Sequence, residues 1–276
     1  MTGESVSQTG VASTTAMMAA CGRGWHLMAH GHGAALKDWL AWPLVGPAAD
    51  QLMGQLNAAM GRETVGPAAA WVAIRARLVE DWLAESGASH YVILGAGLDS
   101  YAWRQDGNRT VIEIDHPASQ QWKRERLEAL VLDVPPAHVW APCDFERESV
   151  ADVLGRIDLG RDLPFISWIA VTPYLTPEAI TATLRALPPC TLAVSYCLPE
   201  DDWTGPGTDP SKMFKAMTAQ RGEALVTAYS PTGFADVLRD CGFEPIHDVG
   251  PEDSLKDFGV EAFSLGFERL ALARKA

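Results

Sequence analysis

The sequence predicts an α/β fold in which a seven-stranded sheet is covered by helices and preceded by a helical segment. Strands and helices alternate from residue 90 onward, which is typical of a parallel sheet covered on both faces. Residues 13–86 show no convincing strand and are typical of helices broken by Gly and Pro. Only residues 250–262, with one helical turn at most, join the last two strands, so the last strand is expected to be antiparallel.

The N-terminal helices are placed by apolar periodicity and by their start and stop residues. Pro67 suits a first helical turn and Gly87 suits a helix end, and the segment between them has apolar residues at helical spacing. The predicted helices are 13–30, 34–42, 48–60 and 67–86. We expect residues 1–86 to form a helical lid or substrate segment.

The remaining elements belong to the sheet and its covering helices. The predicted strands are 91–94, 110–114, 139–141, 165–171, 191–198, 244–249 and 263–273. Helices are expected from Pro117 to about residue 132, after the Thr176 N-cap, and between Ser230 and Gly242. Residues 87–276 would then form one α/β core, with an insertion at 199–230 that is rich in Asp, Gly and Pro where it begins.

Composition excludes several classes of function. The 276 residues carry a formal net charge of -13, and the basic residues are scattered rather than gathered in the stripe of a nucleic-acid binder. The five cysteines are irregularly spaced and include no CxxC, which argues against a disulfide framework or a zinc site. No signal peptide or membrane-spanning run is evident. These features predict a cytoplasmic protein without a membrane partner, and they leave a homo-oligomer open.

A glycine turn follows the first strand, at Gly95, Ala96 and Gly97. Glycines suit a turn where the backbone bends sharply and approaches a ligand closely. The third glycine of a dinucleotide fingerprint is missing, because Ser100 stands in its place. Taken alone, the turn is compatible with a purely structural role.

Two acidic residues follow the next two strands. Asp115 comes 18 residues after Gly97, where a carboxylate can accept hydrogen bonds from both hydroxyls of a ribose. Asp144 and Phe145 follow the third strand, where the carboxylate and the next backbone N–H could bind adenine. Each acid could instead stabilise a helix N-terminus, but the three signals in series favour a nucleoside site. Glu113, two residues before Asp115, is the weaker ribose candidate.

These motifs resemble the leucine carboxyl methyltransferase family, and in particular its bacterial branch linked to polyketide and other secondary metabolism. The resemblance extends over roughly residues 13–198. The similar segments are 13–16 (STTA), 23–26 (RGWH), 75–81 (RARLVED), 94–100 (LGAGLDS), 113–117 (EIDHP) and 171–176 (VTPYLT). The family implies a Rossmann-like methyltransferase sheet and S-adenosyl-L-methionine as cofactor.

The resemblance also implies which residues bind that cofactor. The glycine turn would pass beneath its amino-acid part, Asp115 would bind its ribose, and Arg75 with Arg23 would bind its carboxylate. One departure concerns the segment Trp-Glu-Gly, which here reads Trp168-Ile169-Ala170, so that the usual glutamate is absent. The expected cofactor-binding set is Arg23, Arg75, Gly95, Ala96, Gly97, Asp115, His116, Asp144, Phe145 and Ile169.

Methyl transfer from a sulfonium mainly requires alignment of the acceptor, so no catalytic residue has to appear in the sequence. Tyr174 and His26 are candidate catalytic residues, with packing roles as the alternatives. No metal is expected, because neither Cys nor an acid near His26, His30 and His32 completes a metal site. Large rings of the lid and the insertion could line an apolar substrate pocket, or simply pack; these are Trp25, Trp39, Trp42 and Trp203.

The sequence therefore predicts an O-methyltransferase that acts on a carboxyl or hydroxyl group of a small, polyketide-like acceptor. One alternative is a degenerate methyltransferase fold that serves as a binding or partner protein or as a non-redox cyclase, which the Ile169 departure keeps open. Another alternative is an NAD-dependent dehydrogenase. The missing third glycine and the pair Asp144-Phe145 argue against it.

Overall fold

The structure is a computed structural model that describes residues 13–145, 147–203, 212, 215–216, 218–219, 223–260 and 266–276. Its sheet has the order β3-β2-β1-β4-β5-β7-β6. The strands are β1 His90–Leu94, β2 Thr110–Asp115, β3 His138–Pro142, β4 Phe165–Trp168, β5 Cys190–Cys197, β6 Glu244–Val249 and β7 Glu268–Lys275. β7 pairs antiparallel with both β5 and β6, and the other pairings are parallel. The predicted seven-stranded α/β sheet with an antiparallel last strand is confirmed.

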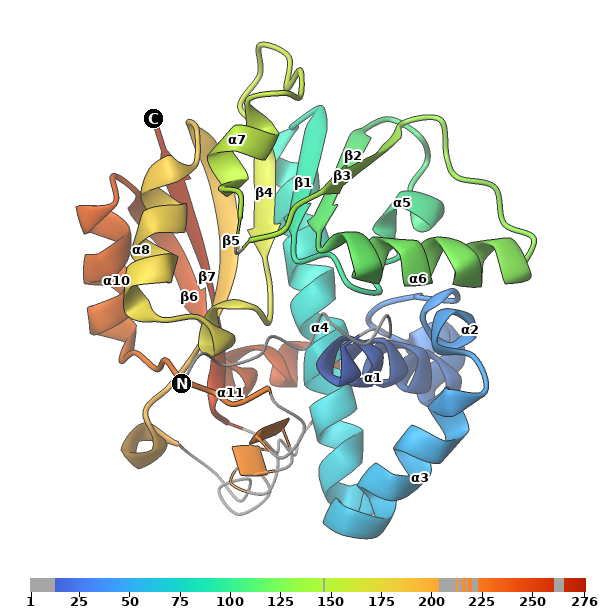
Figure 1. Cartoon of the computed structure of the whole chain (residues 1–276). Coiled ribbons are helices and arrows are strands. Elements are labelled where there is room, and N and C mark those ends of the chain that lie inside the picture. Colours follow the sequence, from blue (N-terminus) through green and yellow to red (C-terminus); the bar gives the residue numbers. More distant parts are fainter. Residues whose placement is uncertain are drawn as a thin grey trace.

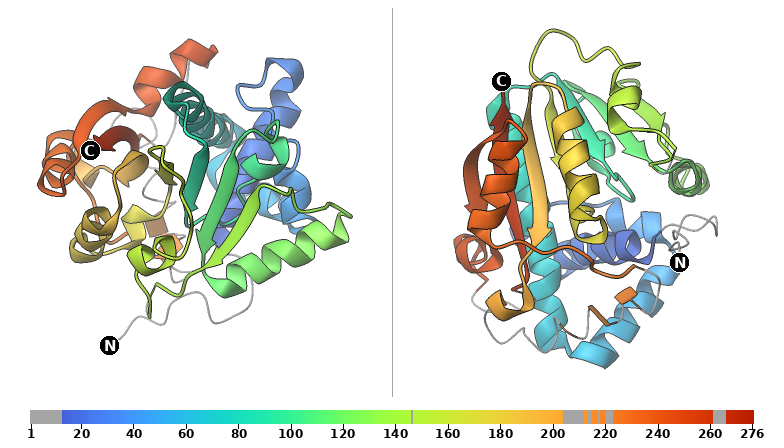
Figure 2. Two further views of the ribbon diagram at one scale, coloured as in Figure 1. Left: turned by 90° about the horizontal axis from the view of Figure 1, so that it is seen from above. Right: turned by 60° about the vertical axis from the view of Figure 1, so that its left-hand side comes forward.

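Helices cover both faces of the sheet (Figures 1 and 2). On one face, α7 Val150–Leu154, α8 Pro177–Ala186 and α10 Pro231–Asp240 pack into the largest apolar cluster. On the other face, α4 Arg62–Ser86 and α5 Tyr101–Arg104 pack against β1 and β7. Strands β4 and β5 are buried at every position, as expected for strands covered on both faces.

The remaining N-terminal helices lie at the carboxyl ends of the parallel strands, below the sheet in Figure 1. α1 Thr14–His30 packs against α2 Ala41–Val45, α3 Ala48–Met60 and α4 around an apolar cluster of their own. α6 Pro117–Ala129 follows β2 and packs against α2, where the Arg126 guanidinium donates to the Leu44 and Pro43 carbonyls, each at 3.0 Å. Two short helical turns, α11 Pro251–Ser254 and η5 Lys256–Phe258, lie in the connection between β6 and β7.

Three predicted boundaries are wrong, each for a local reason. Residues 34–40 are not helical, because Asp38 turns inward and its carboxylate accepts from the Ala41 N–H at 3.0 Å, where α2 begins. α4 begins at Arg62, so Pro67 lies inside the helix, where proline removes a single backbone hydrogen bond. β4 ends at Trp168, because Ala170 has a φ of 58° and breaks the extended run.

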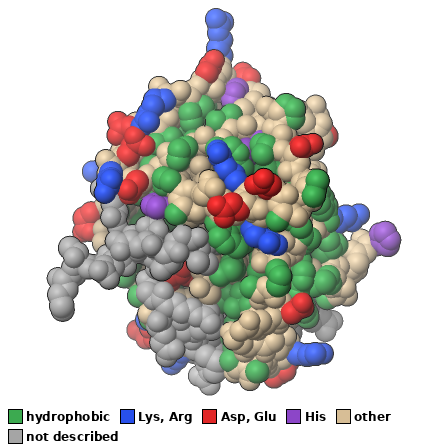
Figure 3. Space-filling view, turned by 45° about the vertical axis from the view of Figure 1, so that its right-hand side comes forward, with side chains coloured by type: hydrophobic (Ala, Val, Ile, Leu, Met, Phe, Trp, Pro, Cys, Tyr) green, Lys and Arg blue, Asp and Glu red, His purple; other side chains and the backbone are tan. Residues whose placement is uncertain are grey.

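The surface agrees with the composition. The face in Figure 3 shows charged side chains of both signs scattered among apolar ones, without a basic stripe in its described part. Within the ranges that the structure describes, no helix is long and apolar enough to cross a membrane. The predicted last strand, 263–273, begins at residues outside the described ranges, and β7 continues to Lys275.

Candidate functional site

A cavity of about 610 Å³ opens at the carboxyl ends of β1, β2 and β4, between the sheet and helices α1 and α4. In open α/β sheets this edge is where ligands bind. Most of the predicted site residues line the cavity: Arg23, Arg75, Gly95, Ala96, Gly97, Asp115, Phe145, Ile169 and Tyr174. His116 and Asp144 adjoin lining residues without lining it themselves, and His26 lies elsewhere.

The glycine turn has a backbone that favours glycine. Gly95 and Gly97 have φ angles of 67° and 49°. A Cβ built on Gly95 would lie 2.5 Å from Val171 Cγ2, and one on Gly97 would lie 3.0 Å from the Ala16 Cβ. The turn is therefore pressed between α1 and the segment after β4, where side chains other than hydrogen do not fit.

Asp115 holds this turn with one carboxylate oxygen. Its Oδ2 accepts from the Gly97 N–H at 2.5 Å, and its Oδ1 accepts from the His116 N–H at 2.6 Å. A carboxylate has about four acceptor positions, so each oxygen retains a lone pair for a ligand hydroxyl. Burial raises the pKa of Asp115, and the two backbone donors oppose that rise. His116 itself caps α6, because its Nδ1 accepts from the Ala118 N–H at 3.1 Å.

The predicted adenine pair is arranged unequally. Phe145 lines the cavity and is 47% exposed. The Asp144 carbonyl accepts from the N–H groups of Arg147 and Glu148, at 2.8 and 2.9 Å, and its carboxylate pairs with Arg147 at 3.4 Å. This is the helical turn of the alternative interpretation, and adenine binding by the pair stays a prediction.

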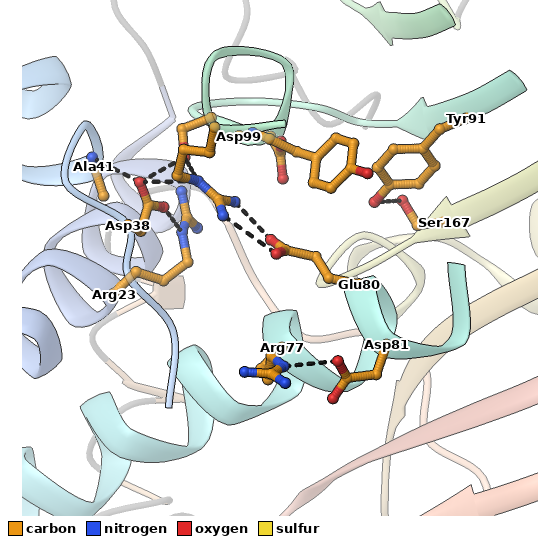
Figure 4. A network of polar contacts seen from close by, with 12 residues as sticks. Arg23, Asp38, Ala41, Arg77, Glu80, Asp81, Tyr91, Asp99 and Ser167 are labelled. Atoms are coloured by element: carbon orange, nitrogen blue, oxygen red, sulfur yellow. Dashed lines mark hydrogen bonds and ion pairs between the residues drawn. The ribbon is translucent and has the colours of Figure 1, made fainter. Parts of the chain in front are cut away.

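Arg23 is held in a buried ionic network (Figure 4). Its Nε donates to Asp38 Oδ2 at 2.8 Å and its Nη2 donates to the Leu98 carbonyl at 2.7 Å. Asp38 Oδ1 also accepts from the Ser100 hydroxyl at 2.6 Å and lies 3.4 Å from the Arg104 Nε. The network ties α1 and the segment before α2 to the loop after β1. Two of its residues could not be recognised from the sequence: Asp38 and Arg104.

Arg75, which also lines the cavity, pairs with Glu268. Its Nη1 donates to both carboxylate oxygens of Glu268, while its buried Nε has no hydrogen-bond partner among the described residues. Trp71 Nε1 also donates to Glu268, at 3.0 Å. Sequence patterns gave no signal for Glu268, because it lies 193 residues from Arg75 and meets it only when β7 runs antiparallel.

Glu223 is a second lining residue that the sequence did not reveal. Its carboxylate accepts from the Ser13 hydroxyl at 2.6 Å and from the Thr15 N–H at 3.1 Å, at the N-terminus of α1. A carboxylate is favoured there by the helix dipole. Ile169 lines the same cavity and packs against the apolar cluster that contains α4. Although position 169 holds no glutamate, Glu223 supplies a carboxylate to the same cavity.

Ala170 occupies the left-handed region at φ 58°, which costs a non-glycine residue about 1 kcal/mol or more. We expect Ala170→Gly to raise the free energy of unfolding by about 1 kcal/mol, measured by urea denaturation. The control is Ala84→Gly, in the exposed helical surface of α4, which should lower it by a similar amount. A loss of stability in Ala170→Gly would show that the backbone is not strained there.

A second, smaller cavity of about 120 Å³ adjoins the first. Apolar side chains of α1, α3 and α4 line it, including Met18, Met53, Leu56, Met60 and Trp71. The lining residues that both cavities share are Thr15, Ala19, Val72, Arg75, Ala170 and Tyr174. The four tryptophans considered from the sequence do not line either cavity; Trp25, Trp42 and Trp203 pack against apolar clusters and Trp39 is 49% exposed.

The two candidate catalytic residues are placed differently. Tyr174 lies at the junction of the two cavities, and burial raises the pKa of its hydroxyl. His26 is buried in α1 and accepts from the Ala35 N–H at 3.1 Å. Burial and the neighbouring His30 lower the pKa of His26 to about 4. Catalytic roles for both residues stay predictions.

Two bacterial proteins are similar to this chain in sequence. YktD of Bacillus subtilis, described by name as an S-adenosyl-L-methionine-dependent methyltransferase, is 30% identical over 60% of this chain and 58% of its own length. A protein of Mycobacterium avium with the same description is 30% identical over 65% of this chain and 58% of its own length. The matched parts thus span little more than half the length of these relatives.

Two solved structures share the fold. A protein from Thermobifida fusca described as a methyltransferase superposes with a TM-score of 0.62 at 18% identity, over 98% of this chain and 97% of its own. A DUF574 family protein from Streptomyces avermitilis gives 0.57 at 17% identity, over 96% and 98%. The sequence model of the leucine carboxyl methyltransferase family matches residues 16–187. That range contains the glycine turn, Asp115 and Arg75, and the chain belongs to the leucine carboxyl methyltransferase family.

Proposed function

We propose that this protein is an S-adenosyl-L-methionine-dependent O-methyltransferase for a small, apolar acceptor such as a polyketide-like metabolite. The observation that carries the proposal is the pair of adjoining cavities. The larger one has the glycine turn and Asp115, and the smaller one is lined almost entirely by apolar side chains. A nucleoside cofactor and an apolar acceptor would thus meet where the two cavities join.

The residues present fit the cofactor. The free lone pairs of Asp115 suit the ribose hydroxyls, and Gly95 and Gly97 line the same cavity with backbone that carries no side chain. The unpartnered Nε of Arg75 suits the carboxylate of the methionine part. Arg23 already has two acceptors, so Arg75 is the better placed of the two arginines. The cofactor supplies the activated methyl group when bound.

The chain's own contribution is positioning and the exclusion of water. Holding two reactants in the right orientation can lower the activation free energy by about 7–11 kcal/mol. Tyr174 at the junction would orient the acceptor, since its hydroxyl stays protonated and can donate a hydrogen bond. Of the predicted lid 1–86, residues 1–12 lie outside the described ranges, and residues 13–86 would act as the lid over the core 87–276. Helix α1 of that segment lines both cavities through Thr15 and Ala19.

Titration calorimetry with S-adenosylhomocysteine tests the proposal. We expect micromolar binding by the wild-type chain and at least about 100-fold weaker binding by Asp115→Ala, because two hydrogen bonds to a charged acceptor are lost. Asp133→Ala, at an exposed position outside both cavities, is the control and should bind as the wild type does. Folded wild-type protein that binds no S-adenosylhomocysteine would contradict the proposal and favour a non-catalytic role.

A further inference from the structure

The smaller cavity has one charged pair among its described lining residues, Arg75 and Glu268. Both side chains are buried, with exposed fractions of 6% for Arg75 and 8% for Glu268. The antiparallel direction of β7 places its first residue, Glu268, beside Cys197, the last residue of β5, and so at the carboxyl edge of the sheet. The carboxylate therefore lies in the smaller cavity, next to Arg75, which lines both cavities.

Arg75 can interact with groups in both cavities. Arg75 lines both of them, whereas Glu268 lines only the smaller, apolar one. Arg75 Nη1 is engaged by Glu268, and its Nε is left for a second acceptor. A guanidinium presents its donors along separate edges, so one arginine can pair with Glu268 and with a cofactor carboxylate together.

The pairing of Arg75 with Glu268 favours a hydroxyl over a carboxylate as the acceptor group. With both edges of Arg75 used, a carboxylate acceptor would add a third negative group beside a single cation, in a place with little access to water. A hydroxyl acceptor carries no charge and can donate its proton in a hydrogen bond to Glu268. Trp71 Nε1 already orients Glu268 from the helix side.

We propose that Glu268 is a catalytic residue that accepts the proton of a hydroxyl acceptor, and that the protein therefore methylates an apolar phenol or enol rather than a carboxylate. The proposal rests on the function proposed above. As the hydroxyl oxygen forms its bond to the methyl carbon, the hydroxyl proton passes to a Glu268 carboxylate oxygen. The electron pair of the broken carbon–sulfur bond stays on sulfur, and the proton later leaves Glu268 for solvent.

Matched probes test this choice. The smaller cavity, at about 120 Å³, is close in size to an apolar cavity of about 150 Å³ that binds benzene, so the probes carry a single ring. 4-Methylphenol and 4-methylbenzoate share that ring and differ in the polar group. In calorimetric titrations of the S-adenosylhomocysteine complex at neutral pH, we expect the phenol to bind at least about tenfold more tightly than the benzoate.

Glu268→Gln should reverse or abolish that preference, because the like charge that disfavours the benzoate is gone. Turnover of 4-methylphenol, followed as S-adenosylhomocysteine release, should fall by about 100-fold or more. Trp71→Phe is the control: it removes a hydrogen bond from the same cluster but keeps the carboxylate, so the preference for the phenol should remain. A purely structural Glu268 would weaken both probes equally.

The outcomes separate the two proposals. If S-adenosylhomocysteine does not bind the wild-type chain, the proposed function itself fails. If it binds and Asp115→Ala abolishes that binding, the proposed cofactor site stands, and the probe titrations decide the role of Glu268 alone. Preference for the benzoate, binding of neither probe, or an unchanged preference in Glu268→Gln would overturn the inference.

Discussion

Gly95→Ala is expected to lower the free energy of unfolding by about 2–5 kcal/mol and to abolish measurable binding of S-adenosylhomocysteine. A φ of 67° costs a non-glycine residue about 1–2 kcal/mol. The new methyl group would also lie 2.5 Å from Val171 Cγ2, and such overpacking costs about 1–3 kcal/mol. Relief of the contact would move the turn that Asp115 holds. Urea denaturation and calorimetry measure the two effects.

Two further variants separate strain from crowding. Gly107→Ala has a comparable φ of 85° but no atom within 4 Å of the new Cβ, so it should show the backbone cost alone. In Gly95→Ala combined with Val171→Ala, the crowding methyl is removed, and part of the lost binding should return. Equal losses in Gly95→Ala and Gly107→Ala would mean that the contact with Val171 contributes nothing.

The sheet edge of the site could be predicted because its signals are local. A glycine turn after one strand and an acid after the next need only the parallel arrangement to come together, and the hydrogen bond from the Gly97 N–H to Asp115 shows that they do. The same logic placed the last strand, because the short connection before β7 could not hold a full crossover helix.

The ion pairs of Glu268 and Asp38 join segments that are distant in the sequence, and no short sequence pattern predicts them. Glu268 resembles an ordinary surface acid in the sequence, yet β7 turns it inward toward α4. Asp38 lies in a stretch that was expected to be helical, and its buried partners come from α1 and the loop after β1. Helical periodicity could not show that a charged residue there points into the protein.

Asp38→Asn should therefore lower the free energy of unfolding at pH 7 by about 3–5 kcal/mol, the usual cost of removing one partner of a buried ion pair. The guanidinium of Arg23 would lose its ion pair with Asp38, and that of Arg104 would keep its ion pair with Glu80. The control is Asp81→Asn. Its pair with Arg77 is also drawn in Figure 4, but the two side chains are 41% and 45% exposed, so the change should stay within about 0.5 kcal/mol.

The stabilising effect of Asp38 is also expected to depend on pH. Burial alone would raise the pKa of Asp38, but Arg23, Arg104 and the Ser100 hydroxyl more than offset burial and lower the pKa below 3.8. A carboxyl whose pKa is lower in the folded state stabilises the protein above its unfolded pKa, and that stability is lost as the pH falls through the folded pKa. Urea unfolding of wild type and Asp38→Asn should therefore converge below a pH of about 3.8 and differ fully at neutral pH. A difference under about 1 kcal/mol at neutral pH would mean that the two arginines find other partners and that Asp38 does not hold the loop after β1.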